Sequence, residues 1–330
     1  MLVPERKGGT SRPRALLLSG ASGFVGSRLL ARFAAGELPA LEGMHIHALS
    51  RSQPPHWPAP GVDFHAVDMA DREALGRVVI GLDPAPTWVL HLAGMANPRE
   101  ASKRPRQARA ANAETTRNLL AALADRGLFA RFLLSSTAAV YGKEAVLVES
   151  GGGRIPEGSR ARSRTAYGWS KRLAERVTLG CQAPGLETLV ARPYNHAGPG
   201  QIAGYVVPDL ANEIRAALAE GRPARTGSLW PERDLLHLDD VIDAYLVLLE
   251  RGEAGRIYDI ARGEALPIQA IYDGLAKRLG QPVGHEVDPT KARSGELRRI
   301  EGDASSLRAL GWRPTKDLDA ILDDALSSAG

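Results

Sequence analysis

The chain has 330 residues, a formal net charge of +4, 44% hydrophobic and 24% charged residues, and a single cysteine, Cys181. This composition is typical of a globular protein long enough for two lobes, and one cysteine excludes an internal disulfide framework. No apolar run approaches the roughly 18 residues of a membrane span, so we expect no membrane partner. Residues 1–13 are basic and polar, and we expect a disordered tail there. The lone cysteine fits a cytoplasmic protein, and we interpret Cys181 as an inert thiol.

The basic excess is compatible with nucleic acid or with phosphorylated small ligands. The most basic run, residues 103–109, has no interleaved aromatic side chains on which bases could stack. We interpret it as a solvated loop and helix start, and we predict no nucleic-acid partner.

A glycine-rich turn follows the first apolar run of the chain. Ala15–Leu18 is predicted to be a buried strand, and the helix after the turn would bury Leu29, Leu30 and Phe33. Glycines spaced G-x-x-G-x-x-G let the backbone approach a pyrophosphate, whose charge a helix N-terminus favours. The sequence therefore predicts a dinucleotide-binding turn made of Gly20, Ser22, Gly23, Phe24, Val25 and Gly26.

Strands and helices alternate through most of the chain, which predicts an α/β fold with a doubly wound parallel sheet. Helices are predicted at residues 106–126, 165 onwards, 208–220 and 239–251. The further strands are expected at His45–Leu49, Val62–Val67, Trp88–Leu92, Phe129–Leu134, Thr188–Arg192 and Arg256–Ile260.

The residue that follows the second strand bears on the cofactor. An NAD site usually places an acidic residue there and an NADP site an arginine, and no Asp or Glu lies between His45 and Gly61. Arg51 therefore favours NADP(H), although NAD(H) and a surface role for Arg51 stay open. Asp68 is predicted either to accept from the adenine amino group or to cap a helix. The other predicted cofactor contacts are Met69, Leu92, Ala93, Gly94 and Pro193.

The fifth strand leads to Ser135-Ser136-Thr137, and a helix that begins near Thr165 places Tyr167 and Lys171 one turn apart. A nearby ammonium lowers the pKa of a phenol, so we expect Lys171 to bring Tyr167 into the range of acid–base catalysis. We expect the Gly/Arg-rich segment 149–164 to form a lid.

The alternation weakens after residue 193. We expect a loop, a helix and a hairpin-like stretch over 194–235, and two or three helices from Leu266 onwards. The predicted cofactor lobe therefore comprises 14–193 and 236–262. The smaller, mostly helical lobe comprises 194–235 and 263–330.

Five motifs occur in the order and spacing of extended short-chain dehydrogenases/reductases, the NAD-dependent epimerase/dehydratase family. They read G-A-S-G-F-V-G, H-L-A-G, S-S-T-A-A-V-Y-G, Y-G-W-S-K and R-P-Y-N. The resemblance implies a Rossmann lobe and a smaller nucleotide-sugar lobe. It also implies that Thr137 contacts the reacting oxygen, that Tyr167 is the acid/base and that Lys171 holds the cofactor ribose. The implied substrate-binding residues are Asn195, Arg233, Arg293 and Glu296.

Three longer stretches read R-P-Y-N-H-A-G-P-G-Q, G-Y-V-V-P-D-L-A and E-R-D-L-L-H-L-D-D-V. They resemble the GDP-mannose 4,6-dehydratase branch, and within it the GDP-6-deoxy-4-keto-mannose reductases that form GDP-rhamnose. The dehydratases carry an acid just after the Ser/Thr, where this chain has Ala138 and Ala139. This departure favours reduction over dehydration. A second departure, Thr115 in place of the usual Gly, is interpreted as a packing change.

The expected reaction is NADPH-dependent reduction of the C4 ketone of a 4-keto-6-deoxy hexose carried on a nucleotide, with GDP as the expected carrier. The resemblance implies a homodimer, and we expect no metal. A 4-epimerase with tightly bound NAD, a 6-deoxy-talose-forming reductase and a combined 3,5-epimerase/4-reductase remain alternatives. A non-catalytic protein on the same fold, either an NADP sensor or an RNA-binding relative, is a further alternative.

Overall fold

The computed structural model describes residues 14–52, 59–82, 87–143, 154–280, 282–291 and 296–327. The tail predicted at 1–13 lies outside the described residues, as does the first part of the segment 149–164 that was predicted to be a lid.

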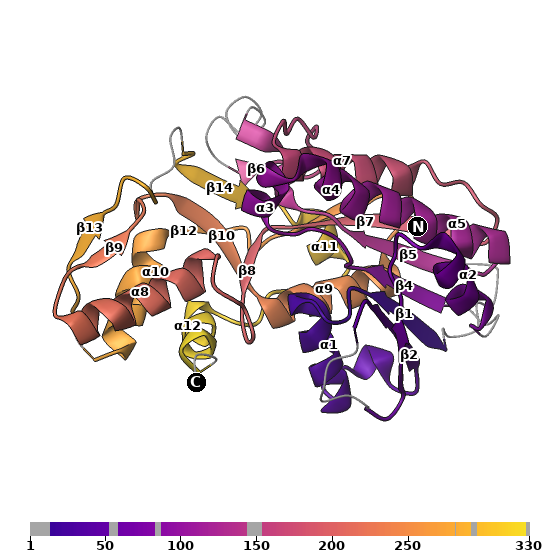
Figure 1. Cartoon of the computed structure of the whole chain (residues 1–330), viewed down its shortest axis with the longest axis horizontal. Helices are drawn as coiled ribbons and strands as arrows, with labels where there is room; N and C mark the ends of the chain where they lie inside the picture. The colour runs from indigo at the N-terminus through magenta and orange to yellow at the C-terminus, as the bar shows by residue number, and fades with distance from the viewer. Residues whose placement is uncertain are drawn as a thin grey trace, which may run out of the picture.

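A seven-stranded, wholly parallel sheet organises the larger lobe (Figure 1). The strand order is β11-β7-β5-β4-β1-β2-β3, so the chain reverses direction across the sheet between β1 and β4. Ligands of such sheets bind outside the carboxyl ends of the strands at this reversal. All seven predicted strands are confirmed, with bounds β1 Ala15–Ser19, β2 His45–Ser50, β3 Val62–Ala66, β4 Thr87–His91, β5 Ala130–Ser135, β7 Leu186–Pro193 and β11 Ile257–Ile260.

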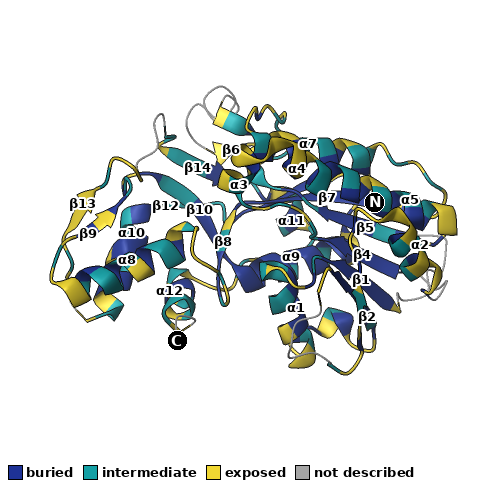
Figure 2. Ribbon diagram, viewed as in Figure 1, coloured by how far each residue is buried: buried dark blue, intermediate teal, exposed yellow. Residues whose placement is uncertain are grey.

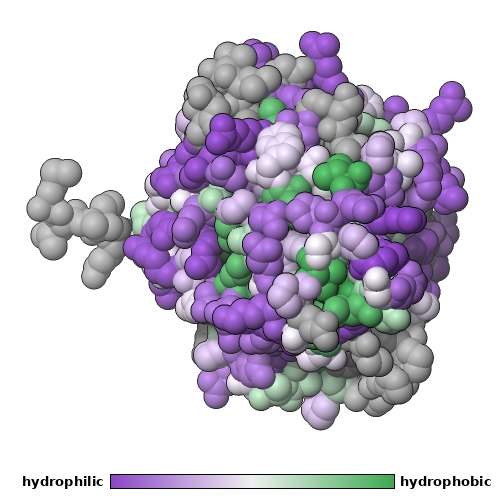
Figure 3. Space-filling model, turned by 90° about the vertical axis from the view of Figure 1, so that its left-hand side faces the viewer, coloured by the Kyte–Doolittle hydropathy of each residue, from purple (hydrophilic) through white to green (hydrophobic). Residues whose placement is uncertain are grey.

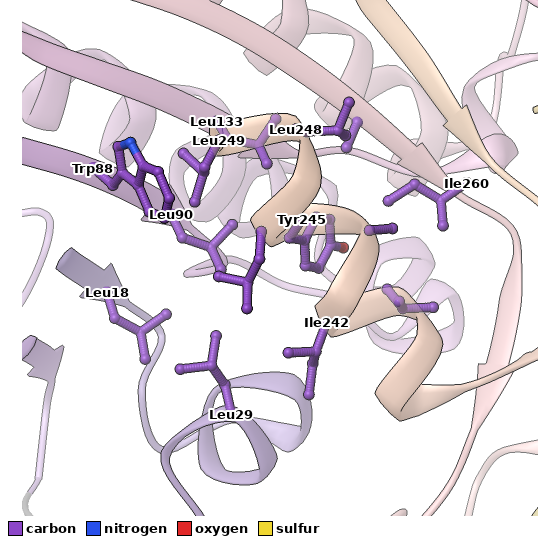
Figure 4. Close-up of a cluster of buried hydrophobic side chains, with 14 of the residues drawn as sticks. Leu18, Leu29, Trp88, Leu90, Leu133, Ile242, Tyr245, Leu248, Leu249 and Ile260 are labelled. Atoms are coloured by element: carbon purple, nitrogen blue, oxygen red, sulfur yellow. The ribbon is translucent and has the colours of Figure 1, made fainter. Parts of the chain in front are cut away.

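Helices cover both faces of this sheet, which leaves the central strands buried (Figure 2). On one face, Leu18 of β1 and Leu29 of α1 (Phe24–Ala34) share a core with Ile242 and Tyr245 of α9 (Leu238–Arg251) (Figure 4). The opposite face packs against α2 (Arg72–Ile80), α5 (Thr115–Arg126) and α7 (Ala166–Leu179).

The helix predicted over 106–126 is interrupted. It forms α4 (Pro105–Arg109), one π-helical turn (Ala110–Glu114) and α5, after the short α3 (Pro98–Lys103). Asn112, in the π turn, accepts a hydrogen bond from the amide of Met95 and donates one to its carbonyl, which ties the turn to the segment after β4.

The smaller lobe combines helices with two sheets. The larger of these has the order β12-β10-β14-β6, with β8 also paired to β10, and the smaller pairs β13 with β9. The predicted hairpin within 194–235 is therefore wrong, because β9 and β10 do not pair with each other and the one pairing inside this range, β8 with β10, is parallel. The elements are β6 Arg154–Ile155, β8 Asn195–Ala197, α8 Val206–Glu220, β9 Ala224–Thr226, β10 Glu232–His237, β12 Ala265–Pro267, α10 Ile268–Arg278, β13 His285–Val287, β14 Arg299–Gly302, α11 Ser305–Ala309 and α12 Leu318–Ser327.

Viewed from the end formed by the smaller lobe, the surface is mainly hydrophilic, with smaller groups of hydrophobic residues between the polar ones (Figure 3). Within the described part of the chain, every helix is too short or too polar to cross a lipid bilayer.

Candidate active site

A cleft of about 1990 Å³ is lined by residues of both lobes. Pockets for a single drug-sized ligand occupy roughly 300–1,000 Å³, so this cleft has room for two ligands side by side. Every predicted site residue that the structure describes lines the cleft. Arg293 lies outside the described residues.

The glycine turn lies where β1 meets α1. Gly20 adopts a positive φ of 74°, and a Cβ there would stand 2.7 Å from the backbone nitrogen of Ala93. A Cβ on Gly26 would collide with the carbonyl oxygen of Gly20 and the Cα of Ala21. Only glycine fits both positions, and α1 begins immediately behind the turn with no acidic residue in its first turn. The turn therefore fits a pyrophosphate group.

The second and third strands supply the residues predicted to meet the adenosine half of a dinucleotide. Arg51 follows β2 directly and is exposed in the cleft. Asp68 Oδ1 accepts a hydrogen bond of 2.9 Å from the amide of Ala70, while Asp71 caps α2 by accepting from Ala74. Of the two roles considered for Asp68, the helix cap thus belongs to Asp71, which leaves the Asp68 side chain at the cleft.

Thr137 and Tyr167 are brought together from two different elements. Thr137 follows β5 and caps a short 3₁₀ turn, Ala138–Val140. Tyr167 lies in the first turn of α7, whose N-cap Thr165 accepts from the amide of Gly168. Burial raises the pKa of the Tyr167 phenol to about 12, while a hydrogen bond with Thr137 acts to lower it. The phenol is therefore neutral near pH 7 and able to donate a proton.

The expectation that Lys171 lowers the pKa of Tyr167 is wrong for this chain. Lys171 is buried, and its Nζ donates a hydrogen bond of 2.9 Å to the backbone carbonyl of Ser135. Burial lowers the pKa of Lys171 to about 8, and the carboxylate of Glu175 acts in the opposite direction. The pKa of Tyr167 is instead raised, chiefly by burial, while the hydrogen bond with Thr137 acts to lower it and Tyr205 acts to raise it.

The predicted substrate residues lie on the smaller lobe's side of the cleft. Asn195 begins β8, and Arg233 lies on β10. Arg233 donates a hydrogen bond of 3.0 Å to the carboxylate of Glu296, and both side chains are largely buried. A second bond, from Arg233 to the carbonyl of Leu297, fixes the guanidinium further. Two residues predicted separately thus form one ion pair.

Sequence reasoning missed a buried network beneath the Tyr167 site. Arg192 forms a two-point ion pair with Glu175, with distances of 2.9 and 2.8 Å, and Ser136 donates to the same carboxylate at 2.6 Å. The network joins α7 to the ends of β5 and β7 and thereby fixes the position of Tyr167. Arg192 and Ser136 lie 17 and 39 residues from Glu175 in the chain, so no short-range sequence pattern predicts these contacts.

Tyr205 was also missed. It is the N-cap residue of α8, it lines the cleft, and its proximity acts to raise the pKa of Tyr167. The position of Cys181 agrees with its interpretation as inert: it follows the end of α7 and packs against the core, and burial raises the pKa of its thiol.

Comparison with known proteins connects this cleft to a family. The model of the NAD dependent epimerase/dehydratase family matches residues 16–261. The GDP-6-deoxy-D-mannose reductase of Pseudomonas aeruginosa is 34% identical over 323 residues, which cover 94% of this chain and 96% of that protein. A UDP-glucose 4-epimerase of Azospirillum brasilense is 29% identical over 334 residues, 94% of this chain and 91% of the relative.

Among solved structures, RMD from Pseudomonas aeruginosa complexed with NADPH superposes with a TM-score of 0.78 at 32% identity. The match covers 96% of this chain and 98% of that one. The larger sheet, the smaller lobe and their order in the chain are thus shared with a solved relative along nearly the whole length.

Proposed function

The chain belongs to the NAD dependent epimerase/dehydratase family, and from this membership we propose that it reduces the C4 ketone of a 4-keto-6-deoxy hexose carried on GDP, with NADPH as reductant. The resulting product is of the GDP-rhamnose type. In this proposal residues 14–193 and 236–262 bind the cofactor, and 194–235 and 263–330 bind the nucleotide sugar.

The observation that carries the proposal is the meeting of Tyr167 and Thr137 in the cleft, where the two side chains are hydrogen-bonded to each other. Reduction of a ketone needs a proton donor, and the phenol of Tyr167 is neutral at physiological pH and hydrogen-bonded to Thr137. Ala138 follows Thr137 in the chain, so this position lacks the carboxylate that a 4,6-dehydratase of the family carries there. A site with a proton donor but without the dehydratase carboxylate supports reduction over dehydration.

A bound NADPH would supply the hydride. The chain's own residues bind the cofactor, orient the ketone and protonate its oxygen. Thr137 holds the ketone oxygen beside Tyr167, and Tyr167 donates its proton to that oxygen as negative charge develops on it. Lys171, fixed on the carbonyl of Ser135, holds the ribose hydroxyls of the cofactor. Placing these groups together supplies much of the rate through orientation.

Two observations support NADPH over NADH. Arg51 stands at the end of β2 with its side chain in the cleft, where a guanidinium suits the 2′-phosphate. The similar Pseudomonas aeruginosa structure is described as complexed with NADPH.

The GDP-linked substrate is supported by the 34% identical reductase, which is named for GDP-6-deoxy-D-mannose. In this chain the ion pair of Arg233 and Glu296 offers a guanidinium to the diphosphate and a carboxylate to a ribose hydroxyl. We include Arg293 as a second diphosphate contact on the strength of the motif alone.

The test is NADPH oxidation by the purified protein with a panel of nucleotide-linked 4-keto-6-deoxy sugars carried on GDP, UDP, CDP and dTDP. We expect GDP-4-keto-6-deoxy-mannose to have the highest kcat/KM and to yield a 6-deoxy hexose on GDP. Interconversion of 4-hydroxyl epimers without net NADPH oxidation would instead establish an epimerase. RNA binding without any turnover would establish the non-catalytic alternative.

A further inference from the structure

The β2–β3 edge of the cofactor lobe carries a group of side chains that the proposed reaction does not use. His45 and His47 lie on β2, and Asp63 and His65 lie on the neighbouring strand β3. In the parallel register of the two strands, His47 pairs with Asp63 and Leu49 pairs with His65. Alternate residues of a strand point to the same face, so all four side chains gather on one side of the sheet.

The donor atoms of this group approach one another closely. His47 Nδ1 and His65 Nε2 are 3.2 Å apart, His45 Nε2 and Asp63 Oδ2 are 2.7 Å apart, and His47 Nδ1 lies 4.0 Å from the same oxygen. One ligand atom from each of His45, His47 and Asp63 falls within 4.8 Å of the others. Three of the chain's eight histidines are therefore concentrated at one point of a strand pair.

These distances resemble those between the ligands of a metal ion. Two ligands of a tetrahedral zinc ion, each about 2.0–2.1 Å from the metal, lie about 3.3 Å apart. Within the group, Asp63 Oδ2 lies 2.7 Å from His45 Nε2 and 4.0 Å from His47 Nδ1, one distance on each side of this value. Asp63 and His45 are exposed enough to adjust, with 60% and 43% of their side chains accessible.

The surroundings leave room for an ion and its waters. A cavity of about 340 Å³ opens beside His47 and His65, and its remaining lining comes from α2, the segment after α2 and the end of β3. β3 is the last strand of the sheet, so the group lies at an open edge. Solvent can therefore deliver the ion and complete its coordination.

We propose that His45, His47 and Asp63 form a binding site for one zinc ion at the β2–β3 edge of the cofactor lobe, with water completing the coordination. Neutral imidazoles and one carboxylate are a ligand set that favours zinc and other late transition ions over magnesium. The ion would tie the edge strand β3 to β2, and the site is separate from the cleft, since none of its three protein ligands lines the cleft.

The experiment uses the full chain, free of any polyhistidine tag and stripped with a chelator. Calorimetric titration with Zn²⁺ should give one ion per chain, and the melting temperature should rise with Zn²⁺ but not with Mg²⁺. Titration with Co²⁺ should give the visible absorption bands of tetrahedral coordination. Asp63→Asn and His47→Gln should each weaken Zn²⁺ binding at least tenfold and abolish the Co²⁺ bands.

His285→Gln is the matched control, because His285 is an exposed histidine on β13 in the smaller lobe. It should leave the Zn²⁺ affinity and stoichiometry unchanged. Equal Zn²⁺ binding by wild type, Asp63→Asn and His47→Gln would overturn the proposal, as would a wild-type Co²⁺ spectrum of purely octahedral character. Since Asp63 is largely exposed, Asp63→Asn keeps the test valid even if His47→Gln folds poorly.

Discussion

Lys171 donates a hydrogen bond of 2.9 Å to the backbone carbonyl of Ser135, which ties α7 to the end of β5. This bond fixes the ammonium at the carboxyl edge of the sheet, one helical turn from Tyr167. The phenol and the ammonium therefore have separate partners, Thr137 and Ser135, and separate pKa values of about 12 and about 8.

Tyr167→Phe should bind NADPH normally and lose turnover by about 10²- to 10⁴-fold, because it removes only the proton donor. Steady-state kinetics and NADPH fluorescence titration measure the two effects. Tyr272→Phe, which removes a phenol outside the cleft, is the control. Near-normal turnover of Tyr167→Phe would remove this residue from the mechanism.

The pH dependence of cofactor binding should follow Lys171. Its pKa is lowered to about 8, so the side chain is charged below this pH and neutral above it. We expect NADPH affinity to fall as pH rises through about 8, while Lys171→Met binds weakly with no such transition. The proton donor Tyr167, with a pKa of about 12, stays protonated over this range. The same transition in Lys171→Met would assign it to another group.

Arg51→Ala should lower NADPH affinity by about 10- to 100-fold and leave NADH affinity nearly unchanged, since a charge-assisted contact to the 2′-phosphate is lost. Arg126→Ala, at the far end of α5, controls for the change in net charge. An equal loss for both cofactors would argue against a 2′-phosphate contact.

Arg233→Ala should raise the KM for the nucleotide sugar at least about tenfold with little change in the KM for NADPH. Arg299→Ala is a suitable control, because Arg299 lies on the neighbouring strand β14, pairs with Glu232 and Glu301, and does not line the cleft. If both variants behave alike, the Arg233–Glu296 pair serves the fold and not the substrate.

Gly26→Ala should destabilise the protein by about 1–3 kcal/mol and abolish NADPH binding, because the added Cβ meets backbone atoms of Gly20 and Ala21 that cannot move aside. Gly76→Ala, also at a helical position but with open space around it, should be neutral or slightly stabilising. Thermal melts of the two variants, with and without NADPH, check both expectations.

The sequence by itself determined the features that depend on neighbouring residues. Short strand-like runs that alternate with helices located all seven strands of the larger sheet, and glycine spacing located the turn between β1 and α1. The spacing of Tyr167 and Lys171 placed both on the first turns of α7. These signals work because hydrophobic burial and backbone sterics act within a few residues of the chain.

Only the tertiary structure decided the contacts between residues that are far apart in the chain. The larger sheet of the smaller lobe joins five short strands from separate segments, β6, β8, β10, β12 and β14. No local sequence pattern predicts how these strands pair. Burial gave Tyr167 a pKa above its ordinary value, although the sequence predicted a lower one. The pairing of Arg233 with Glu296, and of β2 with β3 beneath the histidines, likewise arises when the folded chain brings remote residues within a few ångströms.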